Sequence, residues 1–371
     1  MIHGSVTKQH LKATPPNAAA WRSAILATAG VCFAIALGSR RFRHFDPALL
    51  GYAIGAALAA FAIAYRFSLW AQRPPSRLYL RRGLELFFRP LASKANSTPP
   101  PAATLPLPHG VGTLGYNLSR NFVAQEFIRK RGGYRWIMHL CLSGGSTLAF
   151  AITFPLVFGW IHFESLASNA EMYRLEVFGL GVRTFHIHSL EAMLVFNALN
   201  GAALLVLVGL VMAGFRRWRD PGERATQTFF EDLFPLVLIF AVTVTGLALT
   251  VSYKFLEGRG HALWAVVHML TVVTLLIYIP YGKLFHIFQR ICSLSVSRYK
   301  EHGRAGAQAS CRSCNQEFAS QMHVDDLKLV LDQLGFDYRF ATVRGRVEYQ
   351  DICPPCRRRL FALNQGRSLG R

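Results

Sequence analysis

Charged residues are scarce in this chain, and acidic residues are the scarcest of them. Only 16% of the 371 residues are charged, and 20 acidic residues stand against 41 basic ones. This scarcity and a mean hydropathy of +0.26 exclude an ordinary soluble domain, because the apolar residues gather in long runs. A cleavable signal pattern is also lacking, since the polar start leads into an apolar run that is too long for a signal peptide. We therefore expect an integral membrane protein.

The net charge of +21 does not indicate a nucleic-acid-binding protein. Its basic residues cluster beside the ends of the apolar runs, where the positive-inside rule places them. The long basic loop at 71–134, which contains a Pro-rich linker at 96–108, fixes the cytoplasmic side. We expect a multi-pass protein of a bacterial inner membrane with both termini in the cytoplasm, in contact with lipid and not with nucleic acid.

Six apolar runs are each long enough to cross the hydrocarbon core of a bilayer. The basic loop at 39–46, between the first two runs, would be external and departs from the positive-inside rule. We predict an all-α integral membrane bundle of about six transmembrane helices with a small C-terminal cytoplasmic four-cysteine metal domain. The predicted spans are 18–38, 49–69, 136–160, 189–214, 230–253 and 262–289. The predicted domains are two N-terminal helices (1–70), the basic loop (71–134), a four-helix membrane domain (135–300) and the metal domain (305–371).

The sixth span carries two histidines, His268 and His286, that lie 18 residues apart. On one continuous helix this spacing is five turns, so both rings would leave the same face about 27 Å apart, one near each side of the membrane. A single membrane histidine is most often hydrogen-bonded packing, but the pair favours axial ligation of b-type haem. Pro280 lies between them and could bend the axis.

Crossing directions decide which histidines can meet. His139 begins an outward span and His286 ends an inward one, so both lie near the cytoplasmic face and could bind one iron from opposite sides. At the outer end, His268 needs another partner. Helical angles relative to Asn197 favour His186 over His188 as that partner, and the remaining ring could exchange protons with a quinol. The outer candidates are His186, His188, His162 and His261.

Residues 135–300 resemble the membrane cytochrome b subunit of respiratory nitrate reductase, its gamma subunit. The resemblance is carried by His268 and His286, spaced as in the last helix of that family, and by the segment 215–228, FRRWRDPGERATQT, which reads like a loop of that family. It implies that His139 and His286 hold the haem nearer the cytoplasm and that His268 is one ligand of the haem nearer the periplasm.

The chain departs from that family at one ligand position. The family has another histidine ten residues after His139, where this chain has Ala149. The second haem is therefore ligated from the fourth span or its approach, by His186 or His188, or is absent. The first two spans and the cysteine tail also lie outside the family pattern, so a nitrate reductase partner is not assumed.

Seven cysteines fall into two groups. Three lie in or beside apolar runs and are expected to be small buried hydrophobic residues: Cys32, Cys141 and Cys292. The other four form two CxxC pairs separated by 38 residues, a spacing that predicts a tetrathiolate metal site in a reducing compartment: Cys311, Cys314, Cys353 and Cys356.

Zinc as a structural clamp is the first expectation for this site, and a rubredoxin-like iron or an iron–sulfur cluster is the alternative. Between the two pairs, leucine and valine positions predict one amphipathic helix at 325–340.

These observations predict an electron-transfer subunit that links the quinone pool to a cytoplasmic-side iron–sulfur or molybdenum oxidoreductase. Its cofactors would be one or two haem b groups and the metal in the tail, and its substrate would be a quinone. Two alternatives stay open. One is a non-haem transporter whose histidines relay protons, and the other is a membrane anchor or scaffold with a zinc-binding tail.

Overall fold

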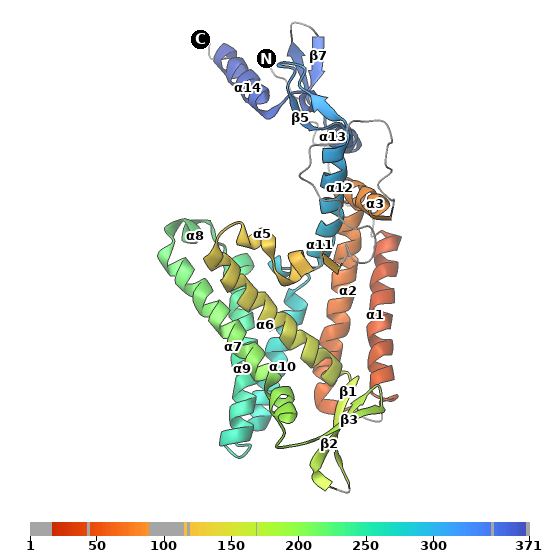
Figure 1. Cartoon of the computed structure of the whole chain (residues 1–371), viewed down its shortest axis with the longest axis vertical. Coiled ribbons are helices and arrows are strands. Elements are labelled where there is room, and N and C mark those ends of the chain that lie inside the picture. The colour runs from red at the N-terminus through yellow and green to blue at the C-terminus, as the bar shows by residue number, and fades with distance from the viewer. Residues whose placement is uncertain are drawn as a thin grey trace. The chain divides into compact units, whose positions relative to one another are not determined.

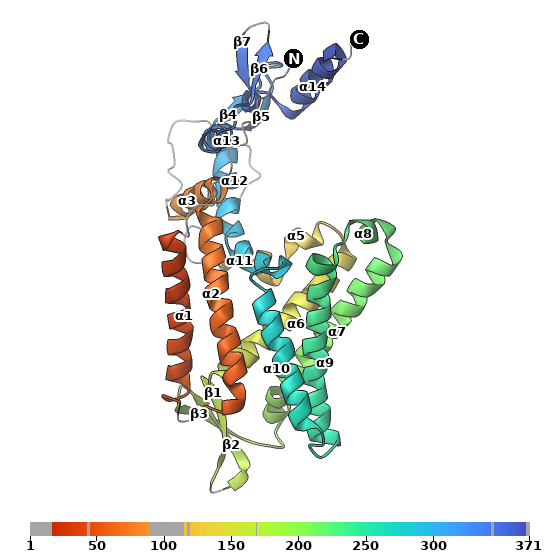
Figure 2. The same cartoon turned by 180° about the vertical axis from the view of Figure 1, so that it is seen from behind.

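The structure is a computed structural model that describes residues 17–42, 45–88, 115–116, 119–167, 169–342 and 345–368. The polar start of the chain and the Pro-rich linker at 96–108 lie outside the described residues. The chain divides into two compact units (Figures 1 and 2). The helical unit comprises Ala18–Arg66 and Gly110–Ile287, and the cysteine unit comprises Met1–Asn17, Phe67–His109 and Phe288–Arg371.

Among the described residues, six helices are long and apolar enough to cross a membrane, which confirms the predicted number of long apolar helices. Their bounds follow the predicted runs closely except at the sixth. They are α1 (Ala18–Gly38), α2 (Leu50–Gln72), α6 (Gly133–Val157), α7 (Leu190–Arg219), α9 (Phe234–Phe255) and α10 (His261–Tyr278). Short helical segments adjoin them: η1 (Pro47–Leu49), η2 (Ser119–Val123), α5 (Glu126–Arg129), α8 (Pro221–Thr226) and η3 (Phe229–Leu233).

The predicted sixth span, 262–289, is not one helix. Helix α10 ends at Tyr278, and a turn leads to the short helices η4 (Lys283–Phe285) and α11 (His286–Ile291). Pro280 has no N–H to continue the helical ladder. Gly282 packs so tightly on the Tyr278 ring that a Cβ there would lie 2.1 Å from ring carbon Cζ. The prediction that His268 and His286 share a face of one helix is therefore wrong.

A three-stranded antiparallel sheet occupies the stretch between the predicted third and fourth spans, so the fold is mostly helical and not all-α. Its strands pair in the order β1 (Ile161–Leu166), β2 (Asn169–Val177) and β3 (Leu180–His186). The aromatic rings of Phe163, Tyr173 and Phe185 gather around Phe196 of α7, with centroid separations of 5.4 to 6.4 Å. This cluster fastens the sheet to the start of α7.

The sheet also explains the basic loop between α1 and α2. The Arg40 guanidinium pairs with the Glu176 carboxylate at 2.7 Å and donates to the Gly179 carbonyl at 3.1 Å. The loop and the sheet therefore lie at the same end of the helical unit, as both views show (Figures 1 and 2). One positive charge of this loop is balanced by an acid on β2.

Glycine residues bring neighbouring helices of this unit into close contact. Helices α6 and α7 run side by side (Figures 1 and 2). A Cβ on Gly145 of α6 would lie 2.8 Å from the Ala202 carbonyl oxygen of α7. On α2, Gly51 faces the Met269 side chain of α10 in the same way. Such small-residue contacts are the usual means by which helices approach in a membrane.

The cysteine unit combines helices with two hairpins. Helix α3 lies inside the segment predicted to be a basic loop, and it packs against α12. Antiparallel pairs form between β4 and β5 and between β6 and β7. The elements of the unit are α3 (Pro74–Phe88), α12 (Ser293–Ala305), β4 (Gln308–Ser310), β5 (Glu317–Ser320), α13 (Gln321–Gln333), β6 (Arg339–Thr342), β7 (Gly345–Glu348), η5 (Tyr349–Asp351) and α14 (Pro354–Ser368).

A buried acid connects three helices of this unit. Asp326 of α13 is 2% exposed, accepts a 2.8 Å hydrogen bond from the Tyr299 hydroxyl of α12 and pairs with Arg82 of α3 at 3.2 Å. Burial raises the pKa of Tyr299, and the bond to Asp326 raises it further. Helix α13 begins and ends earlier than the predicted 325–340. The contact that anchors it is polar and was not predicted.

We expect Gly145→Ala to destabilise the helical unit by about 1–3 kcal/mol, because the added methyl group would overlap the backbone of α7. Thermal unfolding of the purified protein measures this as a lower midpoint temperature. Gly144→Ala is the matched control, since a Cβ at Gly144 meets no atom within 4 Å. Equal midpoints for the two variants would show that α6 and α7 do not pack as described.

Candidate metal and histidine sites

The first cysteine pair lies on the turn between β4 and β5. The Asn315 N–H donates to the Cys311 carbonyl at 2.8 Å, and Asn315 itself adopts a left-handed φ of +56°. Asparagine tolerates this conformation better than most residues. The tight turn brings the Cys311 and Cys314 side chains to the same side of the hairpin.

The second pair lies at the start of α14. Cys353 immediately precedes the helix and Cys356 is in its first turn, while Pro354 occupies a position where a missing N–H costs nothing. Behind the pair, Ile352 is 1% exposed and joins Cys311 and Cys353 in a small core. A hairpin and a helix start thus present two thiols each.

These two pairs meet, as predicted from their spacing. One Sγ atom from each of the four cysteines lies within 4.8 Å of the others, a group that could hold a metal ion. The Sγ atoms of Cys314 and Cys353 are 3.7 Å apart. A tetrahedral ion with bonds of about 2.3 Å to sulfur needs edges of about 3.8 Å, so the thiols fit a single tetrahedral ion.

Backbone groups favour the thiolate form of Cys311. Burial opposes ionisation of the Cys311 thiol, but three backbone N–H groups outweigh it and lower its pKa to about 6. Two of them, from Ser313 and Cys353, donate to the Cys311 Sγ at 3.4 and 3.2 Å. Thiolate is the form that binds a metal.

The remaining cysteines do not join this group. Cys141 and Cys292 are half-buried, whereas Cys32 is exposed on α1. The prediction that all three are buried is therefore wrong for Cys32, which lies on the outer surface of a helix long enough to face lipid.

In the helical unit, His139 lies on α6 and its ring is held by a glutamine. Ser143 donates its hydroxyl hydrogen to the His139 carbonyl at 2.7 Å and accepts the Gln125 amide at 2.6 Å. The Gln125 oxygen must then face His139, whose Nδ1 lies 2.7 Å away. This network assigns the hydrogen to Nδ1 and the lone pair to Nε2.

His268, on α10, has the same tautomer for a different reason. The Thr245 hydroxyl donates to the Ala241 carbonyl at 2.7 Å, so it accepts the His268 Nδ1–H at 2.9 Å. Gly246 makes room for the ring, because a Cβ there would lie 3.2 Å from His268 Cε1. Again the lone pair lies on Nε2.

His286 begins α11, just beyond the break after α10. Its Nδ1 lies 2.6 Å from the Lys283 carbonyl oxygen, which can only accept, so the hydrogen is on Nδ1. Arg66 of α2 holds the preceding turn: its guanidinium donates to the Pro280 carbonyl and lies 4.4 Å from the centroid of the Phe285 ring. Helix α2 therefore supports the segment that presents His286.

His186 and His188 differ from these three. His186 ends β3, and both of its ring nitrogens are engaged: Nε2 contacts the Glu171 carboxylate at 2.9 Å, and Nδ1 accepts the His188 N–H at 3.2 Å. His188 precedes α7, and its ring centroid lies 5.5 Å from that of His186. Neither residue is helical, so the helical angle that favoured His186 does not apply. The other outer candidates are His162 on β1, paired with Glu164 at 3.6 Å, and His261 at the start of α10.

The structure thus brings the four cysteines together and places His139, His268 and His286 on three separate elements. Sequence reasoning missed the groups that orient these rings: Gln125, Thr245 and the Lys283 carbonyl. Thr245 faces His268 from another helix, a relation that no spacing in the sequence reveals. Ser143, which orients Gln125, was also not predicted.

Comparison of the chain with protein-family models, with curated proteins and with solved structures found no match.

We expect the purified chain to carry one metal ion per molecule, and Cys353→Ser to lose it, because a tetrahedral site keeps little affinity with three thiolates. Elemental analysis measures the content and distinguishes zinc from iron. Cys292→Ser is the control, since this cysteine lies outside the cluster. Unchanged metal content in Cys353→Ser would contradict the site.

Proposed function

We propose that the chain is a membrane cytochrome b subunit that passes electrons between a quinone pool and a cytoplasmic-side iron–sulfur or molybdenum oxidoreductase. In this proposal its six long helices cross a bacterial inner membrane with both termini in the cytoplasm. The observation that supports it most is the shared tautomer of three histidines in the helical unit. In each, the Nδ1–H is donated to an oxygen, as is usual for histidines that bind a metal through Nε2.

The donor set fits haem b. His139 and His286 are the proposed ligands of one haem, a pairing that rests on the resemblance to the nitrate reductase gamma subunit and on their place at the ends of spans. When bound, haem b would supply reversible one-electron transfer. The protein's own part is to hold each imidazole in one orientation, through Gln125 at His139 and through the Lys283 carbonyl at His286.

A second haem would use His268 as one ligand. Its partner is not His186 in the described arrangement, because Glu171 and His188 engage both of its ring nitrogens. His188 is the better candidate of the two, and the number of haems, one or two, depends on it. The His186–Glu171 pair, an imidazole beside a carboxylate at 2.9 Å, is instead the group proposed to exchange protons with a quinol.

The four-cysteine site is proposed to hold one ion. Sulfur atoms that all lie within 4.8 Å of one another suit a mononuclear site better than an iron–sulfur cluster, whose additional iron and sulfide atoms would spread the thiolates apart. Zinc would act as a structural clamp. A rubredoxin-like iron would add an electron-transfer centre to the cytoplasmic domain.

The second candidate function is a membrane anchor or scaffold with a zinc-binding tail. A transporter whose histidines relay protons is the other alternative without haem. The observation that favours the scaffold is the cysteine unit itself. A metal-ready cluster and the buried Asp326 network give that unit an ordered core of its own. Absence of haem from the purified protein would leave this candidate in place.

A reduced-minus-oxidised spectrum of the purified protein tests the proposal, and we expect the absorbance bands of b-type haem. His286→Ala should lower the haem content per chain, because it removes one axial ligand. His186→Gln is the matched control and should keep the content of the unchanged protein, since both ring nitrogens of His186 are engaged elsewhere. No b-type bands, or full haem content in His286→Ala, would refute the assignment.

Arg66→Met should shift the midpoint potential of the haem held by His286 by on the order of 60 mV, the one-electron equivalent of a tenfold change. The reason is that Arg66 fixes the turn at Pro280 and the Phe285 ring beside His286. Redox titration measures the potential, and Arg66→Lys should recover part of it. Arg22→Met, on the exposed face of α1, should leave the potential unchanged. An unshifted potential in Arg66→Met would show that α2 does not position this ligand.

A further inference from the structure

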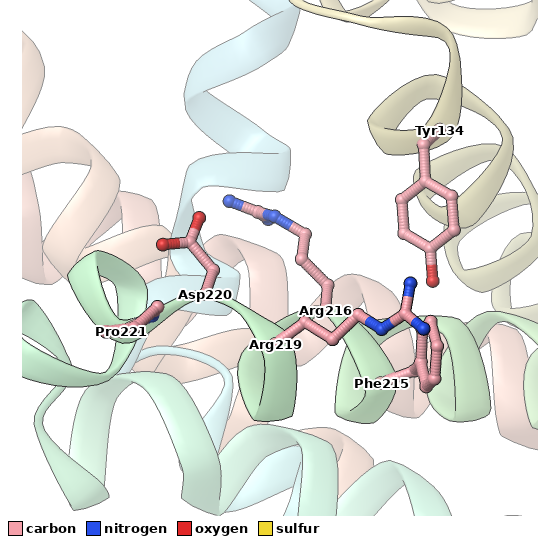
Figure 3. Close-up of a pocket in the computed structure, with 6 residues that line it drawn as sticks. All are labelled: Tyr134, Phe215, Arg216, Arg219, Asp220 and Pro221. Atoms are coloured by element: carbon pink, nitrogen blue, oxygen red, sulfur yellow. The ribbon is translucent and has the colours of Figure 1, made fainter.

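A cavity of about 370 Å³ opens where α6 begins and α7 ends, and none of the histidines or cysteines of the candidate sites lines it (Figure 3). Two arginines, one tyrosine and one phenylalanine supply most of its wall. The lining residues are Tyr134, Phe215, Arg216, Arg219, Asp220 and Pro221.

The cavity lies at the depth of lipid headgroups if α7 crosses a bilayer. Helix α7 has 30 residues, which makes it about 45 Å long, whereas the hydrocarbon core is about 30 Å thick. Its last turns therefore extend into the headgroup layer. Trp218, 72% exposed, stands beside the cavity, and aromatic residues are enriched at this depth.

The local charge is positive and partly unbalanced. Residues 215–224 contain four arginines and two carboxylates. Both carboxylates already have partners. Asp220 accepts the N–H groups of Gly222 and Glu223 at the start of α8, and Glu223 pairs with Arg216 and, at 3.4 Å, with Arg135. The remaining positive charge is available to an anion.

Arg219 is the arginine best placed to meet that anion. Its guanidinium lies 4.4 Å from the centroid of the Phe215 ring, which holds it in one plane. Within the described part of the chain, no hydrogen bond or ion pair joins this guanidinium to another residue. Figure 3 shows the Tyr134 hydroxyl directed toward it, and this hydroxyl gives its own hydrogen to the Met212 carbonyl at 2.8 Å.

We propose that this cavity binds the phosphate of an anionic phospholipid headgroup, with Arg219 as the principal contact and Arg216 as the second. A planar guanidinium can donate two parallel hydrogen bonds to phosphate oxygens. The exposed Trp218 and Phe215 supply apolar surface for the glycerol and acyl carbons, which a soluble phosphate lacks. The proposal needs α7 to span a bilayer but needs no haem.

Native mass spectrometry of the full chain in detergent tests it, with phosphatidylglycerol and phosphatidylcholine added in separate titrations. Both lipids carry the phosphate, but phosphatidylcholine adds a quaternary ammonium that the two arginines would repel, so we expect phosphatidylglycerol to bind about tenfold more tightly. Arg219→Gln should remove this preference, and Arg219→Lys should retain only part of it. Phe215→Leu, which removes the ring beneath the guanidinium, should weaken the same preference by an independent route.

Arg224→Gln is the matched control. It removes the same charge five residues further along the chain, and Arg224 does not line the cavity. Equal affinity for the two lipids would overturn the proposal. An equal loss of the preference for phosphatidylglycerol in Arg224→Gln and Arg219→Gln would also overturn it, because binding would then depend only on the overall positive charge of the surface. Binding of glycerol phosphate as tight as that of phosphatidylglycerol would also overturn it, because the site would then serve a soluble phosphate.

Discussion

Polar groups between long apolar helices need partners from the protein itself, because lipid supplies none. This requirement accounts for the state of His139 and His268 in the helical unit. Thr245 gives its hydrogen to its own helix and so can only accept from His268. Gln125 is oriented by Ser143 and so turns its oxygen to His139. Each ring is thereby left with its lone pair on Nε2, which is the condition for binding a metal.

The break after α10 follows the same rule. Where Pro280 and Gly282 interrupt the helix, the freed carbonyl of Pro280 is taken by Arg66 of α2, and the Tyr278 hydroxyl donates to the Phe230 carbonyl at 2.8 Å. The first two spans lie outside the resemblance to the nitrate reductase subunit. Through Arg66, α2 nevertheless supports the turn that presents His286, so α2 belongs to the candidate site.

Sequence periodicity and spacing were sufficient for the six long apolar helices and the four-cysteine cluster, because both depend on patterns that are local or fixed by metal geometry. They were insufficient where distant residues decide the structure. The sheet at 161–186 is held by Phe196 of α7, and its mixed charges concealed the strand alternation. The tautomer of His268 depends on Thr245, from another helix. A single proline in an otherwise apolar run did not reveal whether the helix bends or ends.

The contact between Arg82 and Asp326 joins positions that are 244 residues apart in the chain. During synthesis, α3 leaves the ribosome long before α13 exists, and four of the six long helices are made in between. The carboxylate that pairs with Arg82 is thus made only after those four helices. A chain cut short before Asp326 cannot form the salt bridge that connects α3 to α13.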